Sequence, residues 1–217
     1  MPVGFRRSFQ LKEVWIVIFT VILTAIAGYI VWIYQTRVSK KERENELKER
    51  LFIFINDLEL RREQDLKAVN KTFEIVVLVE RGRENNSLLD SVSFPKKIDV
   101  STLDQLSQES FHLLPERYRA GVDALKLQAI EINKLLDSLY TKMNAKKDLT
   151  IKDVTGIHCQ IIIYGYTVHQ LDLLGERYIL PNIPHQELLE MSANAFGLSL
   201  SIDDIIANHR NCLARST

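Results

Sequence analysis

Residues 14–34 read VWIVIFTVILTAIAGYIVWIY, and these 21 residues carry no charged side chain. An α-helix rises 1.5 Å per residue, so a helix of this length spans about 30 Å, the thickness of the hydrocarbon core of a bilayer. Trp15, Trp32 and Tyr34 lie near its two ends, where aromatic rings favour the membrane interface. The stretch, here called the apolar segment, predicts a helix that crosses the membrane once.

Two other interpretations of the apolar segment remain open. Arg6, Arg7 and Lys12 precede it, and Ala25-Ile26-Ala27 has the small-x-small form of a signal-peptidase site. However, the run continues to Tyr34, whereas the apolar region of a signal peptide is normally about 7–15 residues long. A buried helix of a soluble core is the second alternative, but an uncharged run of this length has no polar face. We therefore favour a retained anchor preceded by a short basic tail, residues 1–13.

The distribution of Lys and Arg predicts the orientation. Residues 1–13 contain three of them, and the next 20 residues after the apolar segment contain six: Arg37, Lys40, Lys41, Arg43, Lys48 and Arg50. Because cytoplasmic flanks carry the basic excess, we expect the C-terminal part in the cytoplasm. Arg37, Lys40 and Lys41 are expected to contact lipid headgroups. If the C-terminal part lay outside a eukaryotic cell, Asn70-Lys71-Thr72 and Asn85-Asn86-Ser87 would be glycan acceptors.

The composition favours helices and gives no sign of a nucleic-acid partner. Eight Gly and five Pro are about half the usual share of these residues, which favours long helices over many short strands. The 28 Lys and Arg balance the 28 Asp and Glu, so the basic surplus of a nucleic-acid binder is missing. Two cysteines, Cys159 and Cys212, do not make a disulfide framework.

Residues 35–81 predict a juxtamembrane helix, because no Gly or Pro interrupts the chain between Gly28 and Gly82. Its apolar positions Leu47, Leu51, Phe54 and Leu58 step by four, three and four residues, which is a helical stripe. We interpret the stripe as a candidate surface for a partner protein or for self-association, with core packing as the alternative. Residues 82–102, rich in Gly, Pro, Asn and Ser, predict a loop.

Residues 103–217 predict a helical domain that packs with the juxtamembrane helix. Its best pattern is a seam with steps of four and three over about four heptads: Tyr118, Val122, Leu125, Ala129, Ile132, Leu136, Leu139 and Met143. Core packing is the favoured interpretation of this seam and partner binding the alternative. Thr150 and Asp153 have capping-box spacing and predict a helix start. Two short helices are expected at 184–195 and 202–213.

Two stretches leave a second fold open. FEIVVLVE (73–80) and QIIIYGYTV (160–168) are rich in β-branched and aromatic residues, which are common in strands. A small α+β domain is therefore the alternative to the favoured all-α fold, in which the transmembrane helix continues into a soluble helical bundle.

No motif predicts an enzyme, a metal or a cofactor. His158, Cys159, His209 and Cys212 have the residue types of a zinc site, but adjacent residues on a helix point about 100° apart. His169, Asp172 and Glu176 form a polar stripe that is more typical of a solvated face than of acid–base catalysis. The apolar segment holds no Asp, Glu, His, Lys or Arg, which argues against a pump or channel.

The sequence therefore predicts a single-pass, membrane-anchored helical scaffold or adaptor. Its expected partners are the lipid bilayer and either another protein or a second copy of the chain. The alternative is a signalling or sensor protein that transmits a change along one continuous helix through the membrane.

Overall fold

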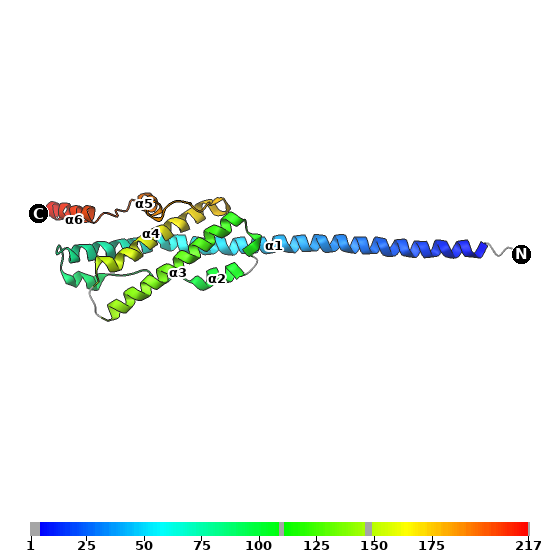
Figure 1. Cartoon of the computed structure of the whole chain (residues 1–217), viewed down its shortest axis with the longest axis horizontal. Helices are drawn as coiled ribbons and strands as arrows, with labels where there is room; N and C mark the ends of the chain where they lie inside the picture. The colour runs from blue at the N-terminus through cyan, green and yellow to red at the C-terminus, as the bar shows by residue number, and fades with distance from the viewer. Residues whose placement is uncertain (1–4, 109–110, 146–148, 217) are drawn as a thin grey trace. The chain divides into compact units, whose positions relative to one another are not determined.

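The computed structural model describes residues 5–108, 111–145 and 149–216, with the side chains of 5–14, 106–108, 208 and 211–216 left out. Helices account for 83% of the chain, and the described residues contain no strand, which confirms the all-α class. The elements in Figure 1 are α1 (Phe5–Glu80), η1 (Asn86–Ser91), α2 (Val100–Gln108), η2 (Phe111–Leu113), α3 (Glu116–Asn144), α4 (Ile151–Leu174), η3 (Gly175–Arg177), α5 (His185–Ala195) and α6 (Ile202–Ser216).

The chain divides into two compact units, Met1–Glu46 and Leu47–Thr217. The first contains the apolar segment, and the second, which we call the body, contains the hydrophobic core. Among the described residues, one helix is long and apolar enough to cross a membrane, and its apolar part is not buried by the rest of the chain.

The body is organised around an antiparallel pair made by α1 from Leu47 onward and α4. Polar contacts join α1 to α4 at three levels and to η3, which follows α4 directly, at a fourth, and the residue numbers rise along α4 and η3 as they fall on α1. In order these contacts are Glu80 with the backbone N–H of Ile151, Asn70 Oδ1 with His158 Nε2 at 3.2 Å, Glu59 Oε1 with His169 Nδ1 at 3.0 Å, and Lys48 Nζ with Glu176 Oε1 at 2.7 Å. The body therefore has an entry end, where Lys48 meets Glu176, and a far end, where Glu80 meets Ile151.

Helix α3 contributes its predicted seam to the core of the body. Seven of the eight seam side chains, from Tyr118 to Leu139, are buried, and Met143 is half-buried against the core. Helix α3 packs along α4 and also contacts α2 (Figure 1). The seam thus packs inside the chain, in agreement with the interpretation that the sequence favoured.

The alternative α+β fold is wrong, because both β-rich stretches are helical. Residues 73–80 belong to α1 and residues 160–168 to α4. Four consecutive residues of α4, from Ile161 to Tyr164, are buried. A helix enclosed on every side needs no polar face, so its sequence lacks the helical periodicity that would have distinguished it from a strand.

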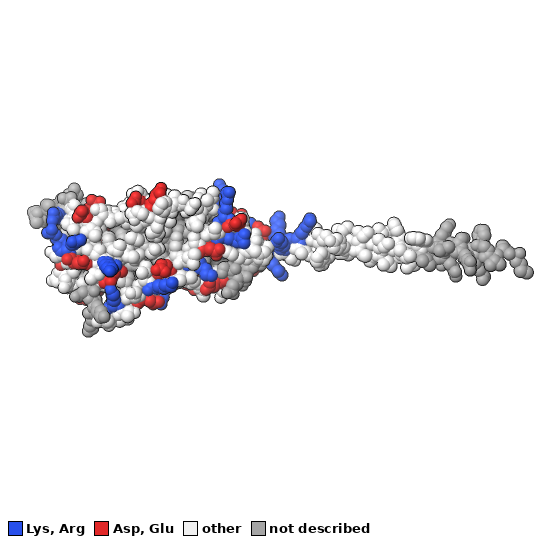
Figure 2. Space-filling view, in the orientation of Figure 1, with Lys and Arg blue, Asp and Glu red and all other residues white. Residues whose placement is uncertain are grey.

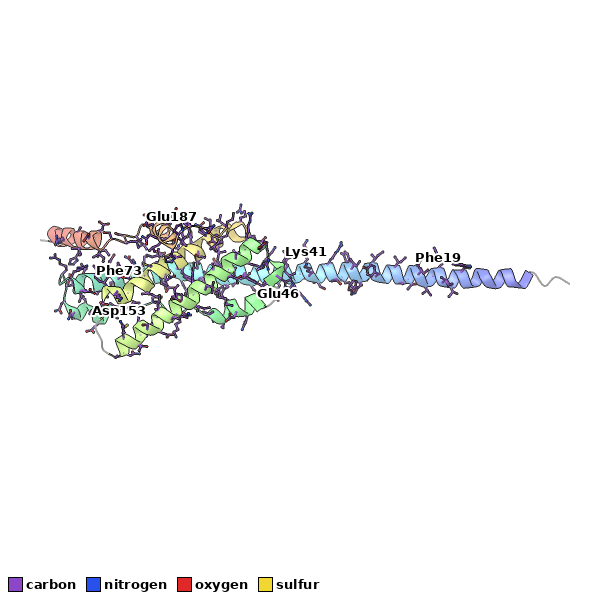
Figure 3. The ribbon with its side chains drawn as sticks, viewed as in Figure 1. Phe19, Lys41, Glu46, Phe73, Asp153 and Glu187 are labelled. Atoms are coloured by element: carbon purple, nitrogen blue, oxygen red, sulfur yellow. The ribbon has the colours of Figure 1, made fainter. Side chains whose placement is uncertain are left out.

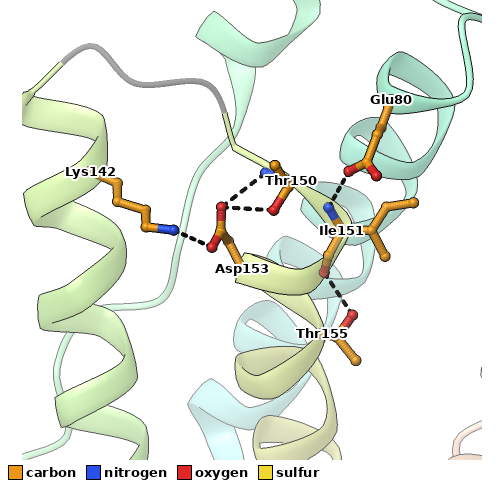
Figure 4. Close-up of polar contacts among 6 residues, drawn as sticks. All are labelled: Glu80, Lys142, Thr150, Ile151, Asp153 and Thr155. Carbon is orange, nitrogen blue, oxygen red and sulfur yellow. Dashed lines mark hydrogen bonds and ion pairs between the residues drawn. The ribbon is translucent and has the colours of Figure 1, made fainter.

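The predicted capping box begins α4 (Figure 4). The Thr150 hydroxyl and the Thr150 backbone N–H both donate to Asp153 Oδ2, at 2.9 and 3.1 Å. Lys142 from the end of α3 forms an ion pair with the same carboxylate, and Glu80 accepts the N–H of Ile151. Three separate parts of the chain therefore meet at the helix start and fix the far end of the body.

The segment predicted as a loop at 82–102 contains η1, and α2 begins within it at Val100. It is held on α3 by Asn133, whose amide donates to the carbonyl of Ile98 at 2.8 Å and accepts the N–H of Ile98 at 2.9 Å. Val92 and Ile98 are buried. The segment is therefore a packed part of the body.

Candidate interaction surfaces

The side chains of the apolar segment from Trp15 to Tyr34 are exposed, apart from half-exposed Ile33. Figure 3 shows Phe19 pointing away from its helix. The hydroxyls of Thr20 and Thr24 donate to the carbonyls of Ile16 and Thr20, each at 2.8 Å. Polar groups in a bilayer must be satisfied internally, so these threonines are compatible with hydrocarbon. An exposed apolar surface with its hydroxyls bonded within the helix is the surface that a membrane-spanning helix requires.

A basic cluster follows the apolar segment. Arg37, Lys40 and Lys41 are all exposed, and Figure 2 shows Lys and Arg gathered on this part of the helix next to a stretch without charges. Basic side chains near an anionic lipid surface contribute about 1 kcal/mol each. The exposure of these three residues is what headgroup contact requires.

The structure places the predicted partner-binding stripe in the core of the body. Leu47 and Leu51 are buried, and Phe54 and Leu58 are half-buried against the core. Core packing, the alternative interpretation, therefore describes Leu47 and Leu51, while Phe54 and Leu58 keep part of their surface exposed. Binding of a partner through the stripe stays a prediction. The periodicity identified an apolar face, but the sequence could not show that the same chain would cover it.

The exposed apolar side chains of α1 within the body lie at positions that the stripe skipped. Phe52, Ile53 and Leu60 are 61%, 54% and 70% exposed. We call these three residues the α1 outer face. Sequence analysis missed them because it looked for apolar residues that recur at helical spacing. The one sequence feature that distinguished these three residues was that they are apolar but lie outside the spacing of the stripe.

A second exposed apolar group lies at the entry end. Leu173 at the end of α4, and Ile179 and Leu180 in the connection to α5, are exposed and form what we call the entry-end patch. Tyr178, the residue before Ile179, is only 2% exposed and packs on Gly121 of α3. Burial raises the pKa of Tyr178 to about 12, although a hydrogen bond with Thr167 opposes the shift. The phenol is therefore neutral and holds the connection on the body.

His158 and Cys159 do not form a reactive pair. His158 is fully buried, its ring is stacked on Phe73 with centroids 4.2 Å apart, and burial lowers its pKa to about 4. Cys159 is half-buried, and burial raises the pKa of its thiol. A neutral imidazole and a protonated thiol support packing, because nucleophilic cysteines require a lowered pKa.

The other candidate metal ligands lie elsewhere. His209 Nε2 is 3.0 Å from Glu84 Oε1, and the side chain of Cys212 lies outside the described residues. Within the described part of the chain, no group of three or more His, Cys, Asp or Glu residues could hold a metal ion.

The predicted polar stripe runs from α4 into η3, and two of its three side chains contact α1. His169 meets Glu59 and Glu176 meets Lys48, as described above, while Asp172 is half-exposed. Partial burial opposes ionisation of Glu59, but hydrogen bonds from Arg62 and His169 bring its pKa below the usual value. The Arg62 guanidinium also lies 4.8 Å from the centre of the Phe196 ring. The ion pairs connect α4 and η3 to α1, and the contact between Arg62 and Phe196 connects the segment after α5 to α1.

Comparison of the chain with protein-family models finds no match, and comparisons with curated proteins and with solved structures find none either.

Proposed function

We propose that this chain is a single-pass, membrane-anchored helical scaffold or adaptor. The observation that carries the proposal is the contrast between the two units. The apolar segment is uncovered and uncharged over a length that suits a bilayer. The body encloses its own core and presents no metal-binding group among its described residues. A protein of this kind acts through its location at a membrane and through the proteins that its surface binds.

The basic cluster supports a cytoplasmic body, since Arg37, Lys40 and Lys41 lie on the C-terminal flank of the apolar segment. The two glycan-acceptor sequences offer a check on this orientation. Asn85 is exposed on the body, whereas the amide of Asn70 is held in a helix by Glu74 at 2.8 Å. On expression with microsomal membranes we expect Asn85 to stay unmodified. A glycan on Asn85 would show that the body lies on the lumenal side, opposite to the proposed orientation.

The α1 outer face is the surface proposed for protein binding. Its three side chains share an exposed part of one helix, and each is more than half exposed. Large exposed apolar side chains on a well-packed body are typical of interaction sites when they occur as a group. The proposed occupant is another protein, and a second copy of the chain is the simplest one, because membrane anchoring raises the local concentration of copies.

A photo-crosslinking amino acid tests this surface in intact membranes. Placed at Leu60 it should give a discrete adduct of higher mass. Placed at Leu127, which is exposed on α3 to a similar extent, 68%, it should give none. Equal and diffuse labelling at both positions, or no adduct at either, would refute the proposed surface.

The alternative function, a sensor that transmits a change through the membrane, is favoured by one observation, which is that α1 is a single helix from Phe5 to Glu80. Inserting two residues between Tyr34 and Leu47 would turn the following helix by about 200°. A scaffold tolerates this change and keeps its Leu60 adduct. A sensor would lose or alter the adduct. A flexible Gly-Ser replacement of residues 35–46 distinguishes the two functions in the same way, because the scaffold would keep the Leu60 adduct and the sensor would not.

A further inference from the structure

Residues 92–98, VSFPKKI, lie between η1 and α2 and belong to neither a helix nor a strand. Every third side chain is buried, at Val92, Pro95 and Ile98. Val92 has φ −67° and ψ 138°, which is the polyproline II conformation, a helix with about three residues per turn. Proline restricts φ to about −65° and favours an extended residue before it. The segment, which we call the internal peptide, therefore has the period of a polyproline II helix.

One stripe of α3 follows the internal peptide in the opposite direction. In order along α3, the contacts are Asn133 with the backbone N–H and carbonyl of Ile98 at 2.9 and 2.8 Å, Asp137 Oδ1 with Lys97 Nζ at 2.5 Å, and the Tyr140 hydroxyl with the carbonyl of Pro95 at 3.2 Å. The three side chains of α3 are four and three residues apart and share one face of the helix. Seven residues of helix rise about 10.5 Å and three residues of polyproline II rise about 9.3 Å, so the two spacings match.

Helix α1 and an aromatic pair complete the contacts of the internal peptide. Thr72 of α1 is only 2% exposed, and its hydroxyl donates to the carbonyl of Ser93 at 2.8 Å. The Phe94 ring meets the Tyr140 ring edge to face, with centroids 6.4 Å apart. Side chains from two helices therefore hold this one segment. We call them the peptide-binding face: Thr72, Asn133, Asp137 and Tyr140.

The chemistry of the peptide-binding face suits extended peptides in general. The carbonyl groups of Ser93, Pro95 and Ile98 each accept a hydrogen bond from a side chain of α1 or α3. A polyproline II segment has no internal backbone hydrogen bonds, so its carbonyl groups are free for such donors, and aromatic side chains bind its prolines. These backbone contacts do not depend on which chain carries the segment. A segment of another protein can therefore make the same contacts.

We infer that the peptide-binding face recognises an extended, proline-containing segment of a partner protein, and that the internal peptide occupies this face as a competitor. The expected partner segment has an apolar side chain three residues after its proline, to match Ile98, and a Lys or Arg directly before that side chain, to pair with Asp137. The covalent link gives the internal peptide a high effective concentration, so the partner binds when the internal peptide opens locally. The site is separate from the α1 outer face and does not depend on the membrane.

A fluorescent peptide with the sequence of residues 90–100 is the probe that tests the site on the full-length chain in detergent. Val92→Ser together with Ile98→Ser weakens the internal peptide, because it removes two buried apolar side chains. We expect fluorescence anisotropy to show that the probe binds this double-serine variant about tenfold more tightly than it binds the wild type. A further Asn133→Ala should weaken binding about tenfold, because two hydrogen bonds to the backbone are lost. Asn194→Ala, at an exposed position on α5, is the matched control and should leave binding unchanged.

Hydrogen exchange in the wild-type chain provides a second measurement that needs no variant. The N–H of Ile98, which donates to Asn133, should exchange at least about tenfold faster than the N–H of Ile132 in α3, because the internal peptide opens while the helix stays folded. Equal exchange at the two positions would mean that residues 92–98 leave their place only when the body unfolds, and the inference would then be wrong.

The binding experiment has three further outcomes. A double-serine variant that does not bind the probe, or that binds it equally well with Asn133→Ala, refutes the peptide-binding face. A wild-type chain that is dimeric in detergent and becomes monomeric when the probe is added would show that a second copy supplies the segment, which overturns the assignment to a partner protein. If the double-serine variant does not fold, hydrogen exchange at Ile98 decides the question.

Discussion

At the scale of single residues, His158 shows how burial decides protonation. It is fully buried, its ring lies on Phe73, and its Nε2 atom is 3.2 Å from Asn70 Oδ1. Burial lowers its pKa from 6.5 to about 4, so the folded body holds it neutral. The unfolded chain takes up a proton at a higher pH than the folded chain does. The histidine therefore gives its full contribution to stability above pH 6.5 and loses it as the pH falls toward 4.

We predict that the free energy of unfolding of the body falls by about 3 kcal/mol through this residue between pH 7 and pH 4. In His158→Gln this part of the pH dependence should vanish, while His185→Gln, at an exposed position on α5, should keep the wild-type dependence. Urea unfolding in detergent, followed by circular dichroism at several pH values, measures the difference. Parallel curves for His158→Gln and wild type would contradict the assignment.

Residue-scale burial was only partly accessible from sequence. The seam of α3 and Leu51 were recognised as apolar helical positions, and both are buried. Phe52, next to Leu51, is 61% exposed, and nothing in its residue type distinguishes the two. Tyr178 was overlooked because it lies in a turn-rich stretch, where burial depends on space left by Gly121 on another helix.

At the scale of elements, the connection after α4 packs closely on α3 because Gly121 has no side chain and Tyr178 occupies the space. A Cβ at Gly121 would lie 2.7 Å from Tyr178 Cδ1 and 3.1 Å from Leu171 Cδ2. At Gly156 on α4 the nearest atom, on Leu135, is 3.7 Å away, which is ordinary contact. Both glycines are in helices, but only Gly121 is required by its neighbours.

We predict opposite effects for the two Gly→Ala changes. Gly121→Ala should destabilise the body by about 1–3 kcal/mol, because overpacking displaces Tyr178. Gly156→Ala should stabilise it by about 0.5–1 kcal/mol, because alanine restricts the unfolded chain and favours helix. Unfolding midpoints of the two variants in detergent check this pair. A stabilised Gly121→Ala protein would show that Tyr178 does not occupy that space.

Local sequence signals predicted where a helix begins better than they predicted which of its faces are buried. Thr150 and Asp153 predicted the start of α4 because a capping box is made within four residues. The interior of α4 was ambiguous, because a run such as Ile161–Ile163, buried on all sides, loses its period. That run resembles a strand until its neighbours are known. The same limit applies to the entry-end patch, whose exposure follows from tertiary packing.

At the scale of the whole molecule, the chain divides into two units with different surfaces. The body buries its apolar seams in its own core, and the uncharged residues 14–34 are long and apolar enough to cross a bilayer. The apolar segment was evident from composition and length alone. The proposed partner surface was not, since the exposed apolar side chains of the body can be located only once its core is known.

Membrane retention of the intact chain tests the central claim most directly. Cell membranes prepared without detergent are washed at alkaline pH, and the mass of the protein is measured. We predict a full-length chain that stays in the membrane fraction and is released only by detergent. Ile22→Arg, near the middle of the apolar segment, should weaken retention because it costs about 2.5–3.5 kcal/mol on insertion. A full-length chain found in the supernatant, or a mature chain that begins at Gly28, would contradict the account.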